Sequence, residues 1–443
     1  MPTIAEQLRI VAENIPKVYE AGKRSAFIIT SNSETPSTAD IGEVKLSYPN
    51  AAHVGTSAFY RCYALTSIDL PAATSIGNSA FYFCSSLTSV NLPTVTSVEA
   101  TAFSGCTALT SIDLPKVTKI NGLQTFYGCS SLTSVNLPEV ISIDESAFQR
   151  CTSLTSVHMP KATSIGVGVF NGCTSLTSID LPAATNLAHS VFAGCTSLTS
   201  IDLPKVTVID VNTFNSCTSL TSIDLPAATS IGARVFNGCT SLTSIDLPAA
   251  TSIGESAFYG CSSLTSVNLP LVSMIGFDSF RDTALTSIDL PNATSIESQA
   301  FLGCASLASV YIPKARSIRN AVFHSCTSLT RIDLPSATAV GEGAFYGCSE
   351  LDTIILSNTE TMCNLNVTAT IGTKIATEEG MPTGEGFVYV PTAFYDGYVT
   401  SVSQQATALL ESQGLPADQA AVMGGQIATA VLRKIEDYPE ILG

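Results

Sequence analysis

The sequence predicts a parallel solenoid of stacked coils, because one phrase recurs fourteen times, about every 22 residues, between residues 44 and 356. In most copies a phenylalanine is followed three residues later by cysteine and then by Leu-Thr-Ser-Ile-Asp-Leu-Pro or a close variant. The copies are marked by Phe59, Phe81, Phe103, Phe126, Phe148, Phe170, Phe192, Phe214, Phe236, Phe258, Phe280, Phe301, Phe323 and Phe345. Such a period is typical of coils that bury apolar side chains only against neighbouring coils. We therefore expect a long binding surface rather than a closed catalytic pocket.

Each copy supplies one strand and its return. In one clear copy Ile245 and Leu247 point inward while the residues between and before them point to solvent, since alternate strand residues face opposite sides. Pro248 ends the strand because it has no N–H for the next ladder bond. Residues 249–254 return the chain with Ile253 inward, and a short helical or extended piece closes the coil. We predict a right-handed α/β solenoid of 14 coils with one long parallel sheet.

Both ends depart from the repeat. Residues 1–23 predict an N-terminal helix, because Thr3 and Glu6 form a capping box and apolar residues recur in steps of four and three up to Pro16. This helix either caps the first coil or drives oligomerisation. Residues 24–43 are rich in Ser, Thr and Pro and predict a linker.

After the repeats, residues 357–386 predict an irregular connector. In residues 387–443 we expect one more strand, Phe387–Pro391, and two helices, 392–413 and 416–437. Open solenoid ends need caps, so this C-terminal part is either a cap or a second functional module.

Composition limits the classes of function. Charged residues make up 13% of the chain, against a usual share of about 25%. The net charge of −16 disfavours nucleic acid, because few side chains would neutralise phosphates. No apolar run reaches the roughly 20 residues of a membrane helix, and the start does not read as a secretory signal. We therefore expect no membrane insertion.

Thirteen of the fourteen cysteines occupy one column of the repeat. They are Cys62, Cys84, Cys106, Cys129, Cys151, Cys173, Cys195, Cys217, Cys239, Cys261, Cys304, Cys326 and Cys348. A uniform column predicts a small buried side chain in each coil rather than disulfides, and ligands in a straight column do not converge on a metal ion. Cys363 lies outside the column and is expected to be the reactive thiol.

The outward strand positions form a serine column and an aspartate column. The second column contains four consecutive aspartates, Asp180, Asp202, Asp224 and Asp246. Stacked carboxylates repel one another, so they either recruit Ca²⁺ or suit hydroxyl-rich ligands such as glycans. Recent copying of the repeat would produce the same column without any ligand, and no other cofactor is expected.

The columns change near the C-terminal end of the repeats. Tyr311 replaces Asp and Arg331 replaces Ser in neighbouring coils, where arginine is otherwise scarce. Aromatic and Arg side chains are the usual anchors of protein interfaces, so these two, with His158 in the aspartate column, are the candidate ligand contacts. Sequence drift near a domain end would also explain the change.

No enzymatic site is evident. The four histidines fall at different points of the repeat, and the serines have no nearby base to activate them. The sequence contains no phosphate loop, nucleotide fingerprint or zinc spacing. We therefore expect a protein that is not an enzyme and has no catalytic residues.

The full phrase, Cys followed by Leu-x-x-Ile-x-Leu-Pro and later by Ile-Gly-x-x-Ala-Phe, resembles the BspA-like class of leucine-rich repeat. This resemblance implies a surface protein of host-associated bacteria or protists that binds extracellular matrix, host cells or other microbes. Residues 4–23 are also similar to the start of tail or baseplate-associated proteins in prophages of gut Gram-positive bacteria. That second resemblance implies a virion tail and a homotrimer formed through the N-terminal helix.

Together these patterns predict a non-enzymatic recognition or adhesion scaffold that binds a surface protein or glycan. The first hypothesis places it on a phage tail as a receptor-binding protein. The second is a bacterial cell-surface adhesin. The third is a structural spacer in which the C-terminal helices bind the partner.

Overall fold

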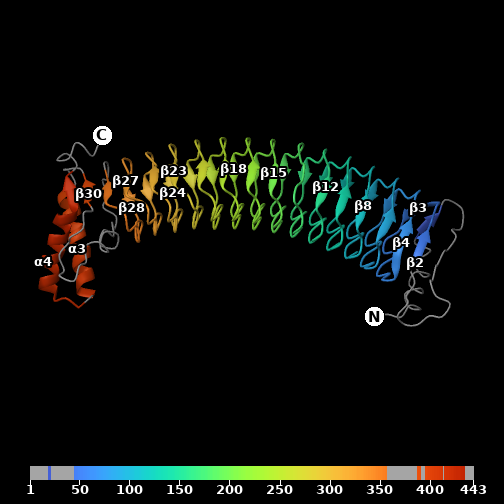
Figure 1. The fold of residues 1–443 in the computed structure, drawn as a ribbon, viewed down its shortest axis with the longest axis horizontal. Helices are drawn as coiled ribbons and strands as arrows, with labels where there is room; N and C mark the ends of the chain where they lie inside the picture. Colours follow the sequence, from blue (N-terminus) through green and yellow to red (C-terminus); the bar gives the residue numbers. More distant parts are fainter. Residues whose placement is uncertain (1–17, 21–43, 357–386, 391–394, 413, 435–443) are drawn as a thin grey trace. The chain divides into compact units, whose positions relative to one another are not determined.

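A computed structural model describes residues 18–20, 44–356, 387–390, 395–412 and 414–434. The chain divides into two compact units, Met1–Leu225 and Pro226–Gly443, called unit 1 and unit 2 below. Eight of the fourteen marker phenylalanines lie in unit 1 and six in unit 2. Both units consist of the predicted coils (Figure 1).

Most coils contribute two strands, not one, and the coil of Asp180 has an isolated bridge in place of its front strand. In each unit the return strands form one parallel ladder, whereas the front strands pair in short parallel sheets of two to four strands, which together are called the front ladder below. The front ladder contains the Ser-Ile-Asp segments, and the return ladder contains the Thr-Ser-Ile segments that lead the chain back. In unit 1 the front ladder comprises β2 (Val44–Ser47), β4 (Leu65–Asp69), β6 (Ser89–Asn91), β8 (Ser111–Asp113), β10 (Ser134–Asn136), β12 (Ser156–His158), β15 (Ser200–Asp202) and β17 (Ser222–Asp224). Its return ladder comprises β3 (Ala51–Val54), β5 (Ser75–Ile76), β7 (Ser97–Val98), β9 (Lys119–Ile120), β11 (Ser142–Ile143), β13 (Ser164–Ile165), β14 (Asn186–Leu187) and β16 (Val208–Ile209). The prediction of a single sheet is therefore wrong.

Unit 2 repeats this arrangement. Its front ladder comprises β19 (Ser244–Asp246), β21 (Ser266–Asn268), β23 (Ser287–Asp289), β25 (Ser309–Tyr311), β27 (Arg331–Asp333) and β29 (Thr353–Ile355). Its return ladder comprises β18 (Ser230–Ile231), β20 (Ser252–Ile253), β22 (Met274–Ile275), β24 (Ser295–Ile296), β26 (Ser317–Ile318) and β28 (Ala339–Val340). No helix occurs within the described coils, which close through turns, so the α/β description does not apply to the repeats. The right-handed sense stays a prediction.

The proline after each front strand starts the turn into the return ladder. In the first full coil the Ala73 N–H donates to the Leu70 carbonyl at 3.1 Å, which closes a turn with Pro71 in its second position. Proline favours that position because its ring fixes φ near the value the turn needs. Leu70 is fully buried, and most front strands are likewise followed by an inward leucine immediately before the turn.

The core of each unit is a column of stacked phenylalanine rings. Neighbouring rings lie with centroids 5.0 to 5.8 Å apart and with interplanar angles of 2 to 14°. The predicted cysteine column lies beside them, buried and free of disulfides. In most coils the thiol donates to the phenylalanine carbonyl of the preceding coil, for example from Cys84 Sγ to Phe59 O at 3.0 Å. The inward prediction for Ile245, Leu247 and Ile253 is also confirmed.

Two coils of unusual length keep this core intact. The extra residue of the coil at 121–126 is accommodated around Gly122, which adopts a φ of 107° and leaves Leu123 exposed. In the coil that lacks one residue, Thr283 replaces the cysteine and its hydroxyl donates to the Phe280 carbonyl at 2.9 Å. The phenylalanine rings on both sides of Phe280 remain stacked.

The prediction of an N-terminal helix is wrong for residues 18–20. Val18–Glu20 forms strand β1, antiparallel to β3, and not the end of a helix. The β3 edge offers unpaired backbone groups, and pairing with them outweighs the helical pattern of the sequence. The rest of the predicted helix 1–23 and the predicted linker 24–43 lie outside the described residues, as does the connector 357–386.

The C-terminal strand and two helices are present. Strand β30 (Phe387–Val390) pairs in parallel with β29 and extends the front ladder of unit 2. Helices α3 (Tyr395–Ser412) and α4 (Ala417–Val431) follow, with Gly414 at a φ of 92° between them. The second helix ends earlier than predicted, because Leu432–Lys434 forms strand β31 on the open edge of β30.

The ring stack predicts a large, local sensitivity to truncation. Changing Phe170 to Ala should lower the free energy of unfolding by about 3–5 kcal/mol, because the ring is fully buried between two others. The control Leu123→Ala should change it by less than about 0.5 kcal/mol, because that side chain is 54% exposed. Urea unfolding followed by circular dichroism measures both, and equal losses would contradict the stacked core.

Burial of the cysteine column predicts that its thiols are inert. Desolvation raises the pKa of Cys173 to about 12, so little thiolate exists at pH 8. In the native protein we expect one of the fourteen cysteines, Cys363, to react rapidly with Ellman's reagent at pH 8, and all fourteen after denaturation. Cys363 lies outside the described residues. Several fast thiols in the native protein would contradict a buried column.

Candidate functional site

The front ladder presents two outward columns of polar side chains in both units. In most of its strands the first and third residues are exposed and the middle residue is buried, as in β8 and β19. The registers align Ser with Ser and Asp or Asn with Asp from one coil to the next. Each unit therefore offers rows of hydroxyls beside rows of carboxylates and amides, all repeated at the spacing of the coils.

Asparagine in the aspartate column links neighbouring coils. The Asn91 side-chain amide donates to the Asp69 carboxylate at 2.8 Å. Asn136 donates to Asp113 at 2.9 Å, and Asn268 donates to Asp246 at 2.8 Å. In these coils the amide donor stabilises a carboxylate that would otherwise face a like charge in the next coil.

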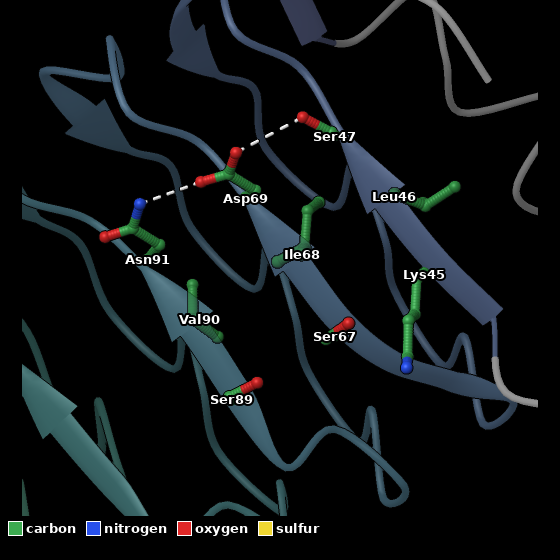
Figure 2. Close-up of a pocket in the computed structure, with 9 residues that line it drawn as sticks. All are labelled: Lys45, Leu46, Ser47, Ser67, Ile68, Asp69, Ser89, Val90 and Asn91. Carbon is green, nitrogen blue, oxygen red and sulfur yellow. Dashed lines mark hydrogen bonds between the residues drawn. The ribbon is translucent and has the colours of Figure 1, made fainter. Parts of the chain in front are cut away.

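A hollow of about 520 Å³ opens on the front ladder of unit 1, over β2, β4 and β6 (Figure 2). Its lining consists of three aligned rows, Lys45–Ser67–Ser89, Leu46–Ile68–Val90 and Ser47–Asp69–Asn91. The last row is continuous, since Asp69 accepts from Ser47 at 3.2 Å as well as from Asn91. Donors, acceptors and an ammonium group at short spacing suit a ligand that carries several hydroxyl groups.

The sequence pattern did not identify this hollow. Lys45 and Ser47 lie on a strand that does not spell the repeated phrase, although Pro49 precedes Pro71 by one period of 22 residues and marks it as a front strand. The 22-residue spacing between these two prolines was the feature of the sequence from which the front strand β2 could have been predicted. The hollow itself depends on the register between three strands, which one strand's sequence does not reveal.

The four predicted aspartates lie at the outward front position of four successive coils, three of them in unit 1. Asp202 and Asp224 are aligned on paired strands of unit 1, and Asp180 is bridged to His158. Asp246 belongs to unit 2 and accepts a hydrogen bond from Asn268. Among the described residues, no group of three or more His, Cys, Asp or Glu side chains is placed to hold a metal ion. Calcium binding stays a prediction.

Tyr311 and Arg331 lie on the front ladder of unit 2, on the contacting strands β25 and β27. Tyr311 is aligned with Asp289 in the aspartate column and is 56% exposed, whereas Arg331 belongs to the serine column of the next coil. The two residues therefore lie diagonally to each other across the neighbouring strands β25 and β27. Partial burial raises the pKa of Asp333, in the column of Tyr311, and the charge of Arg331 offsets part of that rise. An aromatic ring, a guanidinium and a partly desolvated carboxylate thus gather in two coils.

The remaining predicted contacts lie elsewhere. His158 is exposed at the end of β12, aligned with Asn136 and bridged to Asp180 in unit 1. Two further arginines of these coils, Arg316 and Arg319, flank the return strand β26 and are therefore not on the front ladder. Arg319 pairs with Glu297 at 3.6 Å.

Within the part of the chain that the structure describes, no helix has the length and apolar character needed to span a membrane.

Comparisons with known proteins agree with this geometry. The BspA type leucine rich repeat region, in six copies, matches residues 52–177, 141–265 and 273–369. A leucine-rich repeat protein from Bacteroides ovatus is 25% identical, with a TM-score of 0.52 over 78% of this chain and 91% of that chain. A leucine rich cell surface protein from Faecalibacterium prausnitzii is also 25% identical, with a TM-score of 0.44 over 74% and 92%. No curated protein matches the chain. Because the repeat match covers most of both ladders, the chain belongs to the BspA-type leucine-rich repeat family.

Proposed function

We propose that this protein is a non-enzymatic recognition or adhesion protein whose front ladder binds a surface protein or a glycan. BspA-type leucine-rich repeat proteins are typically surface or adhesion proteins, and leucine-rich repeat scaffolds are generally not enzymes. The observation that carries the proposal is Tyr311, an aromatic side chain 56% exposed in a column whose other exposed members are polar. Exposed aromatic residues beside arginine are the usual energetic centres of interfaces.

The chemistry of the front ladder supports this proposal. Its serine hydroxyls and aspartate or asparagine groups recur in register, so a long ligand meets the same donors and acceptors in successive coils. Near β25 and β27 the regular pattern ends, and Tyr311, Arg331 and Asp333 provide a distinct point of contact. A repeated polar face with one aromatic anchor suits recognition better than it suits catalysis.

The cellular setting remains a prediction. A place on a phage tail and a homotrimer rest on residues 1–23, of which the structure describes only Val18–Glu20. A cell-surface adhesin is the alternative. The spacer hypothesis assigns binding to α3 and α4, but β30 and β31 continue the front ladder around these helices, which favours a capping role.

The double variant Tyr311→Ala/Arg331→Ala tests the proposed contact. Labelled full-length protein is applied to arrays of immobilised extracellular-matrix proteins and of bacterial and host glycans, and dissociation constants are measured for the array members that bind. We expect the double variant to bind at least ten-fold more weakly, because it loses both anchors. A matched control, Tyr346→Ala/Arg319→Ala, changes the same residue types in unit 2 away from the front ladder and should bind like the wild type.

Unchanged binding by the Tyr311→Ala/Arg331→Ala variant would contradict the proposed contact on the front ladder of unit 2 and would favour the spacer hypothesis. Absence of binding to every array member would contradict a recognition role. Circular dichroism of both double variants confirms that any loss is not a loss of fold.

A further inference from the structure

The turns that carry the phenylalanines form a second exposed surface, distinct from the front ladder. Two residues after each stacked phenylalanine, the backbone adopts a positive φ in all fourteen coils. This left-handed conformation favours glycine, because a Cβ crowds the backbone there. Glycine occupies the position in eight coils, at Gly105, Gly128, Gly172, Gly194, Gly238, Gly260, Gly303 and Gly347. The relaxed form of the turn is therefore the one with glycine.

The first two coils replace this glycine with large side chains. Arg61 has a φ of 56° and Phe83 a φ of 55°. Phe83 is also 42% exposed, so it adds little to the core while straining the backbone. A bulky residue that is strained and exposed serves folding poorly, and residues of this kind gather at functional sites.

These side chains join neighbouring tyrosines to form an aromatic shelf, defined as Tyr60, Arg61, Tyr82 and Phe83. The Tyr60 and Tyr82 rings are stacked with centroids 5.1 Å apart, and Phe83 lies 4.7 Å from Tyr82 at a tilt of 55°. The Arg61 guanidinium lies 5.2 Å from the centroid of the Tyr60 ring. The shelf thus presents three rings and one cation on two consecutive coils.

Phe83 lies flat against the glycine of the next coil. A Cβ placed on Gly105 would lie 2.9 to 3.1 Å from three atoms of the Phe83 ring, so the ring covers the site where that side chain would stand. One part of the ring is therefore covered by the backbone of the next coil, while Phe83 as a whole remains 42% exposed. A supported, exposed ring is the kind of surface on which the apolar face of a sugar ring stacks.

The electrostatics of these coils select an acidic ligand. The chain has a net charge of −16, yet between Lys45 and Val98 its one carboxylate side chain is Asp69, on the front ladder. Arg61 makes no ion pair with any other described residue. An anion that most of the chain repels would be attracted here. Each partner in a standard protein interface buries roughly 800 Å². The rings of the shelf span only two coils, which is a small surface by comparison.

We propose that the aromatic shelf binds an acidic oligosaccharide. A pyranose ring stacks on Phe83, a carboxylate of the sugar pairs with Arg61, and the Tyr60 and Tyr82 phenols hydrogen-bond to sugar hydroxyls. Arg61 and Phe83 lie on neighbouring coils, and the backbone N–H of Arg61 donates to the Tyr82 carbonyl at 2.7 Å. Both side chains are therefore within reach of neighbouring sugar units. This site does not depend on the proposed role of the front ladder.

The test uses full-length protein and calorimetric titration with two acidic probes, a galacturonic acid tetramer and a hyaluronan tetrasaccharide, with maltotetraose as the neutral comparison. The variants Phe83→Gly and Arg61→Gly introduce the residue that eight other coils carry, so their thermal midpoints should not fall. We expect at least one acidic probe to bind ten-fold more tightly than maltotetraose. Each variant should weaken that binding at least ten-fold, while the control Ser216→Gly, at the same turn position, should leave it unchanged.

Three results would overturn the proposal. The first is that neither acidic probe binds the wild-type protein. The second is that Phe83→Gly or Arg61→Gly binds an acidic probe as tightly as the wild type. The third is self-association of the wild type by light scattering that Phe83→Gly abolishes, which would assign the shelf to a second copy of the chain.

Discussion

The structure depends on one constraint, which is that no coil satisfies its buried groups alone. The Phe59 carbonyl accepts from the Cys62 N–H of its own coil and from the Cys84 thiol of the next, while the Phe59 N–H donates to the Ala80 carbonyl. Each ring also needs a neighbouring ring to cover its face. Both interactions recur from coil to coil within each unit, which explains why the period is kept so strictly and why a small thiol occupies one slot.

The same constraint separates the residues that maintain the fold from those available for binding. Many threonine hydroxyls are used between coils, as when Thr88 Oγ1 donates to the Thr66 carbonyl at 2.9 Å. In the outward columns of the front ladder and in the turns beside the phenylalanines, some side chains are exposed and lie outside the ring stack, so these positions can change without disturbing it. Tyr311 and Phe83 are departures of this kind, and each puts an aromatic ring at the surface without interrupting the ring stack.

The repeat pattern was sufficient to predict the core, because inward Phe, Cys, Ile and Leu recur at one spacing. It was insufficient for the return ladder, whose two-residue strands are too short to show alternation. Leu432–Lys434 read as helix, and only the open edge of β30 explains its pairing as a strand. The front columns followed from alternation, but the hollow at Asp69 depends on strand register. The strain at Phe83 depends on a φ that the sequence does not state.

The most direct test of coil-to-coil stacking is the removal of one whole period. Deleting Cys173–Gly194, which is 22 residues, joins Gly172 to Cys195 and restores the repeated phrase. We expect this variant to fold, with an unchanged circular dichroism spectrum per residue and a cooperative urea transition at a somewhat lower midpoint. Deleting the 11 residues Cys173–Ala183 places Ala184 in the cysteine slot and should abolish that transition. Equal behaviour of the two deletions would contradict the account.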